Sequence, residues 1–262
     1  MHLRERRSLL LPSPGPAVRS FRRHREDRGV IERRAELAGR LSHVRERVAA
    51  AARTAGRDND SITLVVVTKT FPVSDVELLA GLGVRDFGES RHQEAREKVA
   101  AVTAELTWHF VGALQSNKAG AVAGYADVVH SIDRERLVSA LDHGAQRAGR
   151  TLDCLVQVSL DPPDTHTDRS GAPRERIIEI AAKVSAAERL RLRGVMTVAP
   201  MTADPGEAFG QLADVAAELR AEFPAATVIS AGMSEDLEAA IEAGATHVRI
   251  GRAILGQRPP LG

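Results

Sequence analysis

A single lysine, Lys69, follows a run of β-branched residues that is predicted to form a buried strand. The stretch 65–72 reads VVVTKTFP, and the apolar residues 62–67 are typical of a strand that is covered on both faces. An ammonium group at the end of such a strand must be solvated, paired or used chemically, because burying it alone is unfavourable. A lysine amine can lose its proton and form an imine with a carbonyl compound. Lys69 is therefore a candidate nucleophile, and a lysine that only extends into solvent is the alternative.

The scarcity of lysine makes this position more informative. The chain has 36 basic residues, of which only four are lysines: Lys69, Lys98, Lys118 and Lys183. Arginine keeps its proton and cannot form an imine. A composition that uses arginine for ordinary positive charges therefore makes each lysine a candidate for a specific role.

Two segments late in the sequence have the residue types of an anion site. Residues 228–236 read VISAGMSED and precede a predicted helix over 235–243, and residues 248–252 read VRIGR. Backbone N–H groups at the start of a helix lack partners within that helix and bind anions. Each segment alone is also explained by helix capping or by a strand-to-helix turn, but together they predict a phosphate cradle. The candidate residues of this site are Ser230, Gly232, Ser234, Arg249, Gly251 and Arg252.

The elements that must position these residues alternate along the chain. Strand-like runs are predicted at 62–68, 84–88, 107–111, 127–132, 152–160, 190–198, 226–231 and 246–250. Amphipathic helices are predicted between them, at 74–82, 90–102, 116–124, 134–148, 174–187, 205–222 and 235–243. This alternation indicates parallel βα units in an α/β protein.

Eight such units favour a closed (β/α)8 barrel of the TIM type. The rival fold, an open doubly wound sheet, requires a glycine-rich turn after its first strand, and residues 68–72 contain no glycine. Functional residues of a barrel lie at the C-terminal ends of its strands, and phosphate is bound by the loops after strands 7 and 8. The barrel therefore predicts that Lys69 and the phosphate cradle share one mouth.

A lysine that captures an aldehyde beside a phosphate cradle indicates pyridoxal 5′-phosphate (PLP) as the ligand. PLP requires a lysine, a phosphate grip and a partner for its ring nitrogen. Arg249, just before the Ile-Gly turn, is the candidate for that partner. Because arginine cannot accept a proton, it would leave the ring nitrogen unprotonated and weaken the ring as an electron sink.

The chain resembles the pyridoxal phosphate homeostasis proteins, a family built on a barrel like the N-terminal domain of alanine racemase. The resemblance extends over about 30–258 and is carried by VVVTKTFP (65–72), FGESRHQEAREK (87–98), WHFVGALQSNK (108–118), SIDR (131–134), VQVSL (156–160), RGVM (193–196) and SAGMSEDLEAAIEAGATHVRIGRAILG (230–256). It implies that Lys69 holds PLP as a Schiff base. It also implies that Ser230, Ser234 and Gly251 grip the phosphate.

Two departures from the family pattern concern the site. Asparagine usually follows Phe-Gly-Glu, where this chain has Ser90, and threonine commonly follows Arg-Ile-Gly, where it has Arg252. At Arg252 a hydroxyl contact is lost, while a backbone N–H and a cation remain.

The resemblance implies a protein of intracellular PLP homeostasis that buffers or delivers the cofactor, with effects on amino and keto acid levels. Apo forms of PLP-dependent enzymes are the expected recipients, and no catalytic residue is assigned. The alternative is an amino-acid racemase-like enzyme, which needs a second base from a further domain. The chain ends at Gly262 after the last predicted helix, and its only tyrosine, Tyr125, follows the third strand. We therefore expect a protein without catalysis. A class I aldolase is a weaker option, because its imine-forming lysine is typically on a later strand.

Composition excludes several other classes of protein. The net charge of +1 predicts neither a nucleic-acid nor a membrane-surface partner, and no apolar run approaches the roughly 18 residues of a membrane span. The lone cysteine, Cys154, is predicted to be a core residue. One cysteine cannot form a disulfide framework, so a reducing cytoplasm is expected. No set of His, Asp and Glu has metal-ligand spacing. A monomer is expected rather than a dimer.

Two domains follow from these patterns. Residues 1–29, rich in arginine and proline, are predicted to be a disordered basic extension, with a transit peptide or an early gene start as alternatives. Residues 30–262 are predicted to be the barrel, beginning with an extra helix over 30–55.

Two further features near the mouth stay open. The QSNK stretch 115–118 either shapes the site or only starts a helix, with Lys118 in solvent. His109 is expected to be a hydrogen-bonded core residue rather than a catalytic one.

Overall fold

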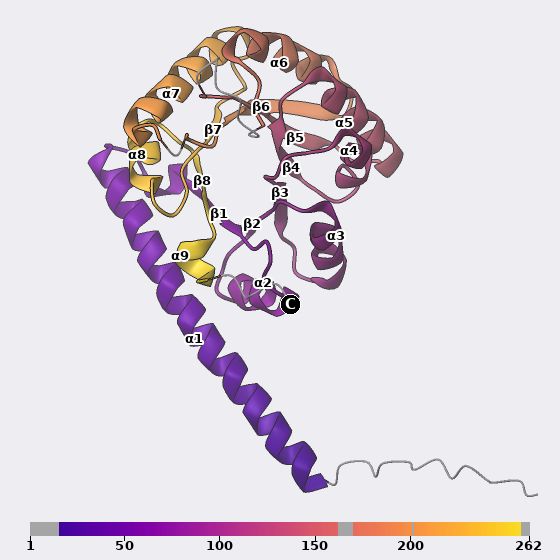
Figure 1. Ribbon diagram of the computed structural model, residues 1–262, viewed down its shortest axis with the longest axis vertical. Helices are drawn as coiled ribbons and strands as arrows, with labels where there is room; N and C mark the ends of the chain where they lie inside the picture. The colour runs from indigo at the N-terminus through magenta and orange to yellow at the C-terminus, as the bar shows by residue number, and fades with distance from the viewer. Residues whose placement is uncertain (1–15, 162–169, 201, 258–262) are drawn as a thin grey trace, which may run out of the picture. The chain divides into compact units, whose positions relative to one another are not determined.

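Eight parallel strands close into one barrel in the order β1-β2-β3-β4-β5-β6-β7-β8. The structure is a computed structural model and describes residues 16–161, 170–200 and 202–257. Helices α2 to α8 alternate with the strands and surround them, as Figure 1 shows. The predicted TIM-type (β/α)8 barrel is confirmed.

The strands are β1 (Thr63–Val67), β2 (Asp86–Glu89), β3 (Thr107–Phe110), β4 (Val128–Ile132), β5 (Leu152–Gln157), β6 (Leu190–Met196), β7 (Val228–Ser230) and β8 (His247–Ile250). The α-helices are α1 (Pro16–Thr54), α2 (Val73–Gly81), α3 (His92–Ala101), α4 (Ser116–Val122), α5 (Glu135–Ala148), α6 (Ile177–Ala186), α7 (Pro205–Glu222), α8 (Leu237–Glu242) and α9 (Arg252–Leu255). Short 3-10 helices η1 (Asn59–Ser61) and η2 (Arg174–Arg176) precede β1 and α6. Every predicted strand and helix of the barrel is present, with bounds that differ by a few residues.

The first helix begins earlier than the sequence predicts. Helix α1 starts at Pro16 rather than near residue 30, so residues 16–29 are helical where their composition predicts disorder. Proline is compatible with the first position of a helix, because its missing N–H would have no partner there. Residues 1–15 lie outside the described residues. The chain divides into a unit of Met1–Glu36 and a second unit of Leu37–Gly262, which contains the barrel.

Within the second unit, the later part of α1 packs against the barrel by an apolar stripe. Leu37, Leu41, Val44 and Val48 are at most 5% exposed and recur at the three- and four-residue spacing of one helix face. They join a cluster that includes residues of α2, α8, β1 and β8. A second apolar cluster lies among β3 to β7 and helices α4 to α7.

The closure of the barrel brings its first and last strands together. Strand β1 pairs in parallel with β8, with Val65 opposite Arg249 and Val66 opposite Ile250. At the end of this pair, a Cβ atom added to Gly251 would lie 3.1 Å from the carbonyl oxygen of Val67. The turn after β8 therefore packs tightly against the strand that leads to Lys69.

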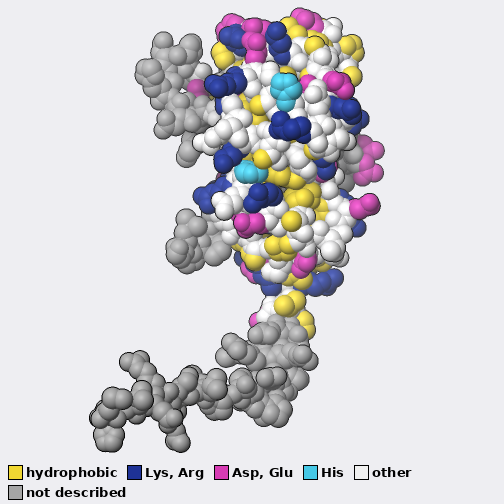
Figure 2. Space-filling view, turned by 90° about the vertical axis from the view of Figure 1, so that its right-hand side faces the viewer, with side chains coloured by type: hydrophobic (Ala, Val, Ile, Leu, Met, Phe, Trp, Pro, Cys, Tyr) yellow, Lys and Arg dark blue, Asp and Glu magenta, His cyan; other side chains and the backbone are white. Residues whose placement is uncertain are grey.

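The surface shows no predominance of one charge on the face drawn in Figure 2, where cationic and anionic side chains are interspersed with apolar ones. Among the helices in the described part of the chain, none combines the length and apolar character of a membrane span.

Candidate functional site

A pocket of about 520 Å³ lies at the C-terminal ends of the strands, and we call it the mouth pocket. This volume is within the range of about 300–1,000 Å³ that is usual for small-molecule sites. Five of the seven predicted site residues line it: Lys69, Ser234, Arg249, Gly251 and Arg252. Its apolar lining is provided by Val67, Phe71, Val111, Val198 and Met233. One mouth thus combines a lysine, cations and an apolar wall.

The other two predicted residues, Ser230 and Gly232, are not part of this lining. Ser230 is fully buried, and its hydroxyl is bonded to other side chains. Gly232 has a left-handed φ of 89°, and its carbonyl oxygen accepts from the N–H of Arg249 at 2.9 Å. A side chain at this glycine would come within 2.7 Å of Ala240. Gly232 therefore shapes the turn that leads from β7 to the pocket.

Lys69 lies in a tight turn directly after β1. The N–H of Phe71 donates to the carbonyl oxygen of Thr68 at 3.1 Å, which closes the turn around Lys69. Thr70 has a φ of 69°, the left-handed region that β-branched residues rarely adopt. Contacts around the turn must therefore hold this conformation.

Those contacts come from a set of polar side chains that we call the Lys98 network: Thr68, Glu89 and Lys98, which are buried, and Glu94, which is partly buried. Lys98 Nζ donates to Glu89 Oε1 at 2.7 Å and to Glu94 Oε1 at 2.6 Å. It also donates to the carbonyl oxygen of Thr68 at 2.7 Å. The hydroxyl of Thr68 donates to Glu89 Oε1 at 2.6 Å, so β1, β2 and α3 are joined beneath the turn.

The electrostatics of this network centre on Glu89, which is 2% exposed. Burial raises the pKa of Glu89, and the neighbouring Lys98 ammonium opposes that shift. Glu89 Oε2 makes no hydrogen bond to any residue that the structure describes. Removing Lys98 would therefore leave a buried acid without its main stabilising charge.

The barrel interior holds a second polar chain, the interior polar chain, which consists of Asp86, His109, His130, Ser230 and Arg249. Arg249 Nη1 donates to the Ser230 hydroxyl at 2.7 Å, and Ser230 is 3.0 Å from His130 Nδ1. His130 Nε2 lies 2.9 Å from His109 Nδ1, whose ring contacts Asp86 through Nε2 at 3.0 Å. The expectation that His109 is a hydrogen-bonded core residue is confirmed.

Burial determines which side chains of the interior polar chain are charged. Burial lowers the pKa of Arg249 to about 10, so its guanidinium stays charged at neutral pH. Burial first, and then repulsion by His109 and Arg249, lowers the pKa of His130 far below its ordinary value. Arg249 Nη2 also donates to the carbonyl oxygen of Thr197 at 2.7 Å. The charged guanidinium is thus fixed in one orientation at the floor of the mouth pocket.

The side of the pocket that the sequence predicts to bind phosphate is built around the start of α9. Gly251 is the N-cap residue, and the hydroxyl of Ser234 accepts from the N–H of Ala253 at 3.2 Å. Arg252 extends to the rim, where it lies 3.6 Å from Glu235. Because the Ala253 N–H is occupied, the backbone N–H and the side-chain cation of Arg252 are the groups here that can receive an anion.

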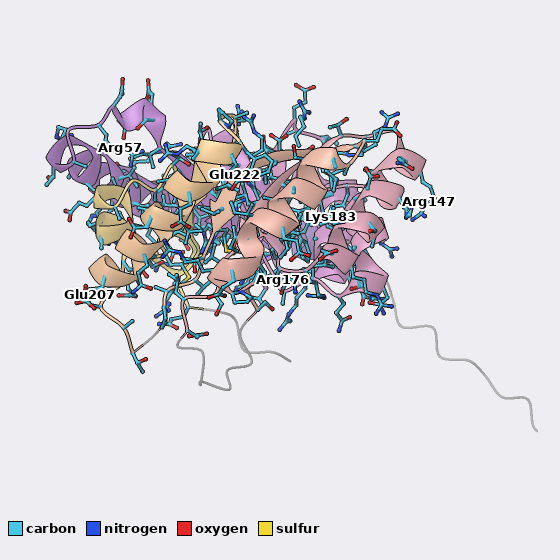
Figure 3. The ribbon with its side chains drawn as sticks, turned by 90° about the horizontal axis from the view of Figure 1, so that it is seen from above. Arg57, Arg147, Arg176, Lys183, Glu207 and Glu222 are labelled. Carbon is cyan, nitrogen blue, oxygen red and sulfur yellow. The ribbon has the colours of Figure 1, made fainter. Side chains whose placement is uncertain are left out.

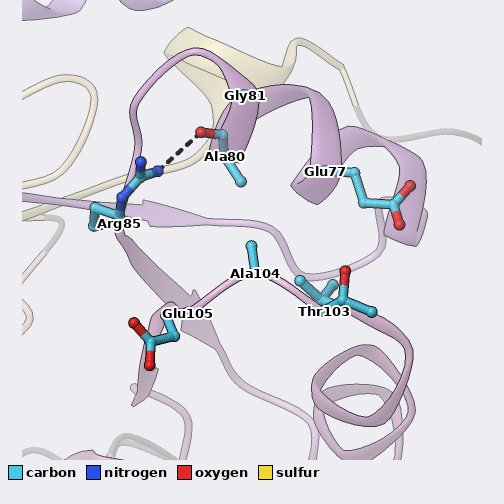
Figure 4. Close-up of a pocket in the computed structure, with 8 residues that line it drawn as sticks. Glu77, Ala80, Gly81, Arg85, Thr103, Ala104 and Glu105 are labelled. Atoms are coloured by element: carbon cyan, nitrogen blue, oxygen red, sulfur yellow. Dashed lines mark hydrogen bonds between the residues drawn. The ribbon is translucent and has the colours of Figure 1, made fainter.

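A larger pocket of about 670 Å³ lies at the opposite end of the strands (Figure 4). It is formed by the end of α2 and the segment 102–105 that leads to β3. Arg85 in its wall donates to the carbonyl oxygens of Ala80 and Val84, both at 2.9 Å. No predicted site residue lines it, and the N-terminal ends of barrel strands serve stability rather than chemistry.

The remaining candidates lie away from the mouth pocket. QSNK coincides with the start of α4, and Lys118 is exposed there and does not line the pocket. Tyr125 stacks on His92, with its hydroxyl 3.3 Å from the ring Nδ1. Cys154 is fully buried in β5, as predicted. Within the described residues, no group of three or more His, Cys, Asp or Glu is arranged to hold a metal ion.

Comparison with known proteins identifies the family. The alanine racemase N-terminal domain family matches residues 40–259. A pyridoxal phosphate homeostasis protein of Mycobacterium tuberculosis is 43% identical over 244 residues, which cover 87% of this chain and 95% of that protein. The chain belongs to the pyridoxal phosphate homeostasis protein family. The Escherichia coli protein of the same name is 38% identical over 231 residues, covering 85% and 97% of the two chains.

A solved structure extends this comparison to the fold. PipY of Synechococcus elongatus, determined with PLP bound, superimposes with a TM-score of 0.73 at 32% identity. The match covers 84% of this chain and all of the PipY chain. The resemblance that the sequence indicated is therefore confirmed for both family and fold.

The Lys98 network was not predicted from the sequence. Two signals were present in the motif FGESRHQEAREK. Glu94 and Lys98 have the four-residue spacing that brings side chains together on a helix, and Lys98 is one of only four lysines. What the sequence could not show is that α3 presents this pair to the turn after β1.

Proposed function

We propose that the protein binds PLP in the mouth pocket, attached to Lys69, and serves PLP homeostasis by buffering and delivering the cofactor. The observation that carries this proposal is that Lys69, Arg249 and the Gly251-Arg252 turn line one pocket of about 520 Å³. The names of the relatives and the PLP bound in PipY support the choice of ligand.

Each group has a distinct role in this proposal. Bound PLP would supply an aldehyde for the lysine amine and an electron-accepting ring. Lys69 would hold the ligand, and Gly251 would let the backbone N–H of Arg252 approach the phosphate. Arg252 would add a positive charge at the rim. Ser230 supports this site through Arg249 rather than from the pocket wall.

Arg249 would face the ring nitrogen with N–H groups that Ser230 and Thr197 do not use. Its pKa of about 10 keeps it protonated at neutral pH, so it can only donate to the ring. The ring nitrogen would then stay unprotonated, which limits the stabilisation of negative charge on a substrate carbon. This feature disfavours reactions that need a strongly electron-accepting ring.

The alternative is a racemase-like enzyme, which the match to the alanine racemase N-terminal domain favours. Racemisation needs a base on each face of the substrate carbon. Among the described residues that line the pocket, the acids are Glu235 and Asp236, and both belong to its phosphate side. Asp236 Oδ1 already accepts from the N–H of Met233 at 2.5 Å, and Tyr125 lies outside the lining. We therefore infer that the described lining of the pocket offers no second base opposite Lys69.

One experiment separates the two functions. The PLP-loaded protein is incubated with a panel of L-amino acids and, separately, with an apo-transaminase. We expect negligible turnover of the amino acids and recovery of transaminase activity. A Lys69→Ala variant loaded under the same conditions is the control for transfer from the site. Racemase or transaminase turnover of roughly 1 per second or more would overturn the carrier proposal in favour of the enzyme.

A further inference from the structure

Lys98 is linked to both chain neighbours of Lys69, and we propose that it is a positioning residue that fixes Lys69 for its bond to the ligand. This inference rests on the proposed function, because it concerns the residue that would hold PLP. Lys98 Nζ donates directly to the carbonyl oxygen of Thr68 at 2.7 Å. It reaches Thr70 through Glu94, whose Oε1 accepts both from Lys98 at 2.6 Å and from the Thr70 N–H at 2.5 Å.

The site around residue 98 matches an ammonium group in number and direction. An ammonium has three N–H donors, and Lys98 has three acceptors within 2.7 Å: the Thr68 carbonyl, Glu89 and Glu94. Lys98 is only 3% exposed, so these contacts fully occupy its charged end. Arginine, with its planar fork, cannot direct its donors to three converging acceptors in the same space. This explains a lysine at 98 in a chain that otherwise uses arginine almost throughout.

The conformation of Thr70 shows why the turn needs such support. Its φ of 69° lies in the left-handed region, which is unfavourable for a β-branched residue. The bond from its N–H to Glu94 holds that conformation, and Lys98 in turn orients Glu94. The dihedral angles on either side of Lys69 set the direction of its side chain. Lys98 and Glu94 therefore determine where the Lys69 amine can reach.

The expected benefit is preorganisation. A nucleophile that is already oriented toward its target needs no further ordering when the bond forms. Loosening the turn should slow the attachment of PLP and weaken the complex, without removing any group that touches PLP. Lys98 itself is excluded as an attachment point, because its donors are occupied and its side chain is buried.

The test compares Lys98→Arg and Glu94→Ala with two matched controls in the full-length protein. Lys183→Arg makes the same lysine-to-arginine change on the exposed face of α6 (Figure 3). Leu219→Ala removes a fully buried side chain of α7 and lowers stability without touching the turn. The PLP-free proteins are titrated with PLP, and three quantities are followed: the attachment rate, the affinity, and the pH dependence of the visible absorption band.

We expect Lys98→Arg and Glu94→Ala to weaken PLP binding at least tenfold and to shift the pH profile of the band. Lys183→Arg should behave as wild type, and Leu219→Ala should lose thermal stability with an unchanged pH profile. Wild-type affinity and pH profile in both network variants would overturn the inference. If Lys98→Arg fails to fold, Glu94→Ala decides, because the Glu94 side chain is 24% exposed and its removal leaves the Lys98–Glu89 pair in place.

A second measurement does not depend on PLP. Amide hydrogen exchange at Thr70 in the PLP-free protein should be at least tenfold faster in both network variants than in wild type. Equal exchange would overturn the positioning role even where PLP binds. If wild-type protein binds no PLP, the proposed function fails, and faster exchange in the variants would still establish that Lys98 and Glu94 hold the Lys69 turn.

Discussion

Arg249 and Ser230, on the neighbouring strands β8 and β7, are joined by a hydrogen bond of 2.7 Å in the closed interior of the barrel. The serine hydroxyl is also 3.0 Å from His130 Nδ1. Ser230 thus holds the guanidinium that forms the floor of the mouth pocket, whereas the family resemblance places it on the phosphate.

This relationship gives different expectations for the two serines of the SAGMS segment. Ser230→Ala leaves a buried guanidinium N–H without its acceptor, so it should lower the free energy of unfolding by about 1–3 kcal/mol. Ser234→Ala removes the acceptor for the Ala253 N–H, and should lower stability by about 1 kcal/mol, as helix-capping losses do. Of the two variants, only Ser234→Ala should make inorganic phosphate a weaker competitor of PLP binding. Urea unfolding measures the stability, and titration of PLP in the presence of phosphate measures the competition. If Ser230→Ala kept wild-type stability but phosphate no longer competed with PLP, Ser230 would be assigned to the phosphate.

Hydride reduction of the PLP complex should leave a pyridoxyl group on Lys69. The bound group should then no longer exchange with free PLP. Lys118 and Lys183 are both exposed and serve as internal controls for non-specific labelling. Peptide mapping by mass spectrometry identifies the labelled lysine. A label mainly on either control, or undiminished yellow colour in Lys69→Ala, would rule out the assignment.

Stability should fall in mild acid because histidines in the barrel are shielded from water, His130 completely and His247 in part. Burial lowers the pKa of His247 from 6.5 to about 4, with a further contribution from His109. The unfolded chain therefore binds a proton at His247 more readily than the folded protein does. The contribution of neutral His247 to the free energy of unfolding is fully present above about pH 6.5 and is lost as the pH falls toward 4. For His247 alone the loss is roughly 3 kcal/mol at about 1.4 kcal/mol per pH unit.

The check is urea unfolding between pH 7 and pH 4 for His247→Gln and for a control, His43→Gln. His43 is exposed on α1, so its replacement should leave the wild-type pH dependence unchanged. In His247→Gln the free energy of unfolding should fall less steeply as the pH decreases. An equally steep fall in wild type and in His247→Gln would show that this histidine does not cause the loss of stability.

A chain that begins at Val30 should keep the melting temperature and PLP content of the full-length protein. Among the described side chains of α1, the core contacts begin at Leu37, and Val30 and Ile31 are more than half exposed. A chain that begins at Leu41 is the matched control, because losing Leu37 should cost about 2–5 kcal/mol and lower the melting temperature by roughly 4 °C or more. Scanning calorimetry measures the melting temperatures of both chains. A drop of several degrees for the chain that begins at Val30 would show that residues 1–29 contribute to the core.

The sequence was most informative where local pattern decides structure. Runs such as 62–67 predict strands because β-branched residues favour a covered sheet, and the same pattern places Lys69 at a strand end. It was least informative where partners are distant in the chain. The Ser230 hydroxyl looks like a phosphate ligand in its own segment, but its partner His130 is 100 residues away. The early start of α1 was missed because prolines before Pro16 obscured a stretch, 17–28, that contains neither glycine nor proline.

The pairing of β1 with β8 has a consequence for how the protein is made. Lys69 enters the growing chain early, whereas Arg249 and Gly251 are added near the end of synthesis. Because chains emerge at about 5–20 residues per second, the two walls of the mouth pocket are separated by roughly ten seconds or more of translation. A nascent chain on the ribosome therefore has Lys69 but neither Arg249 nor the turn after β8, and the mouth pocket exists only once the barrel is complete.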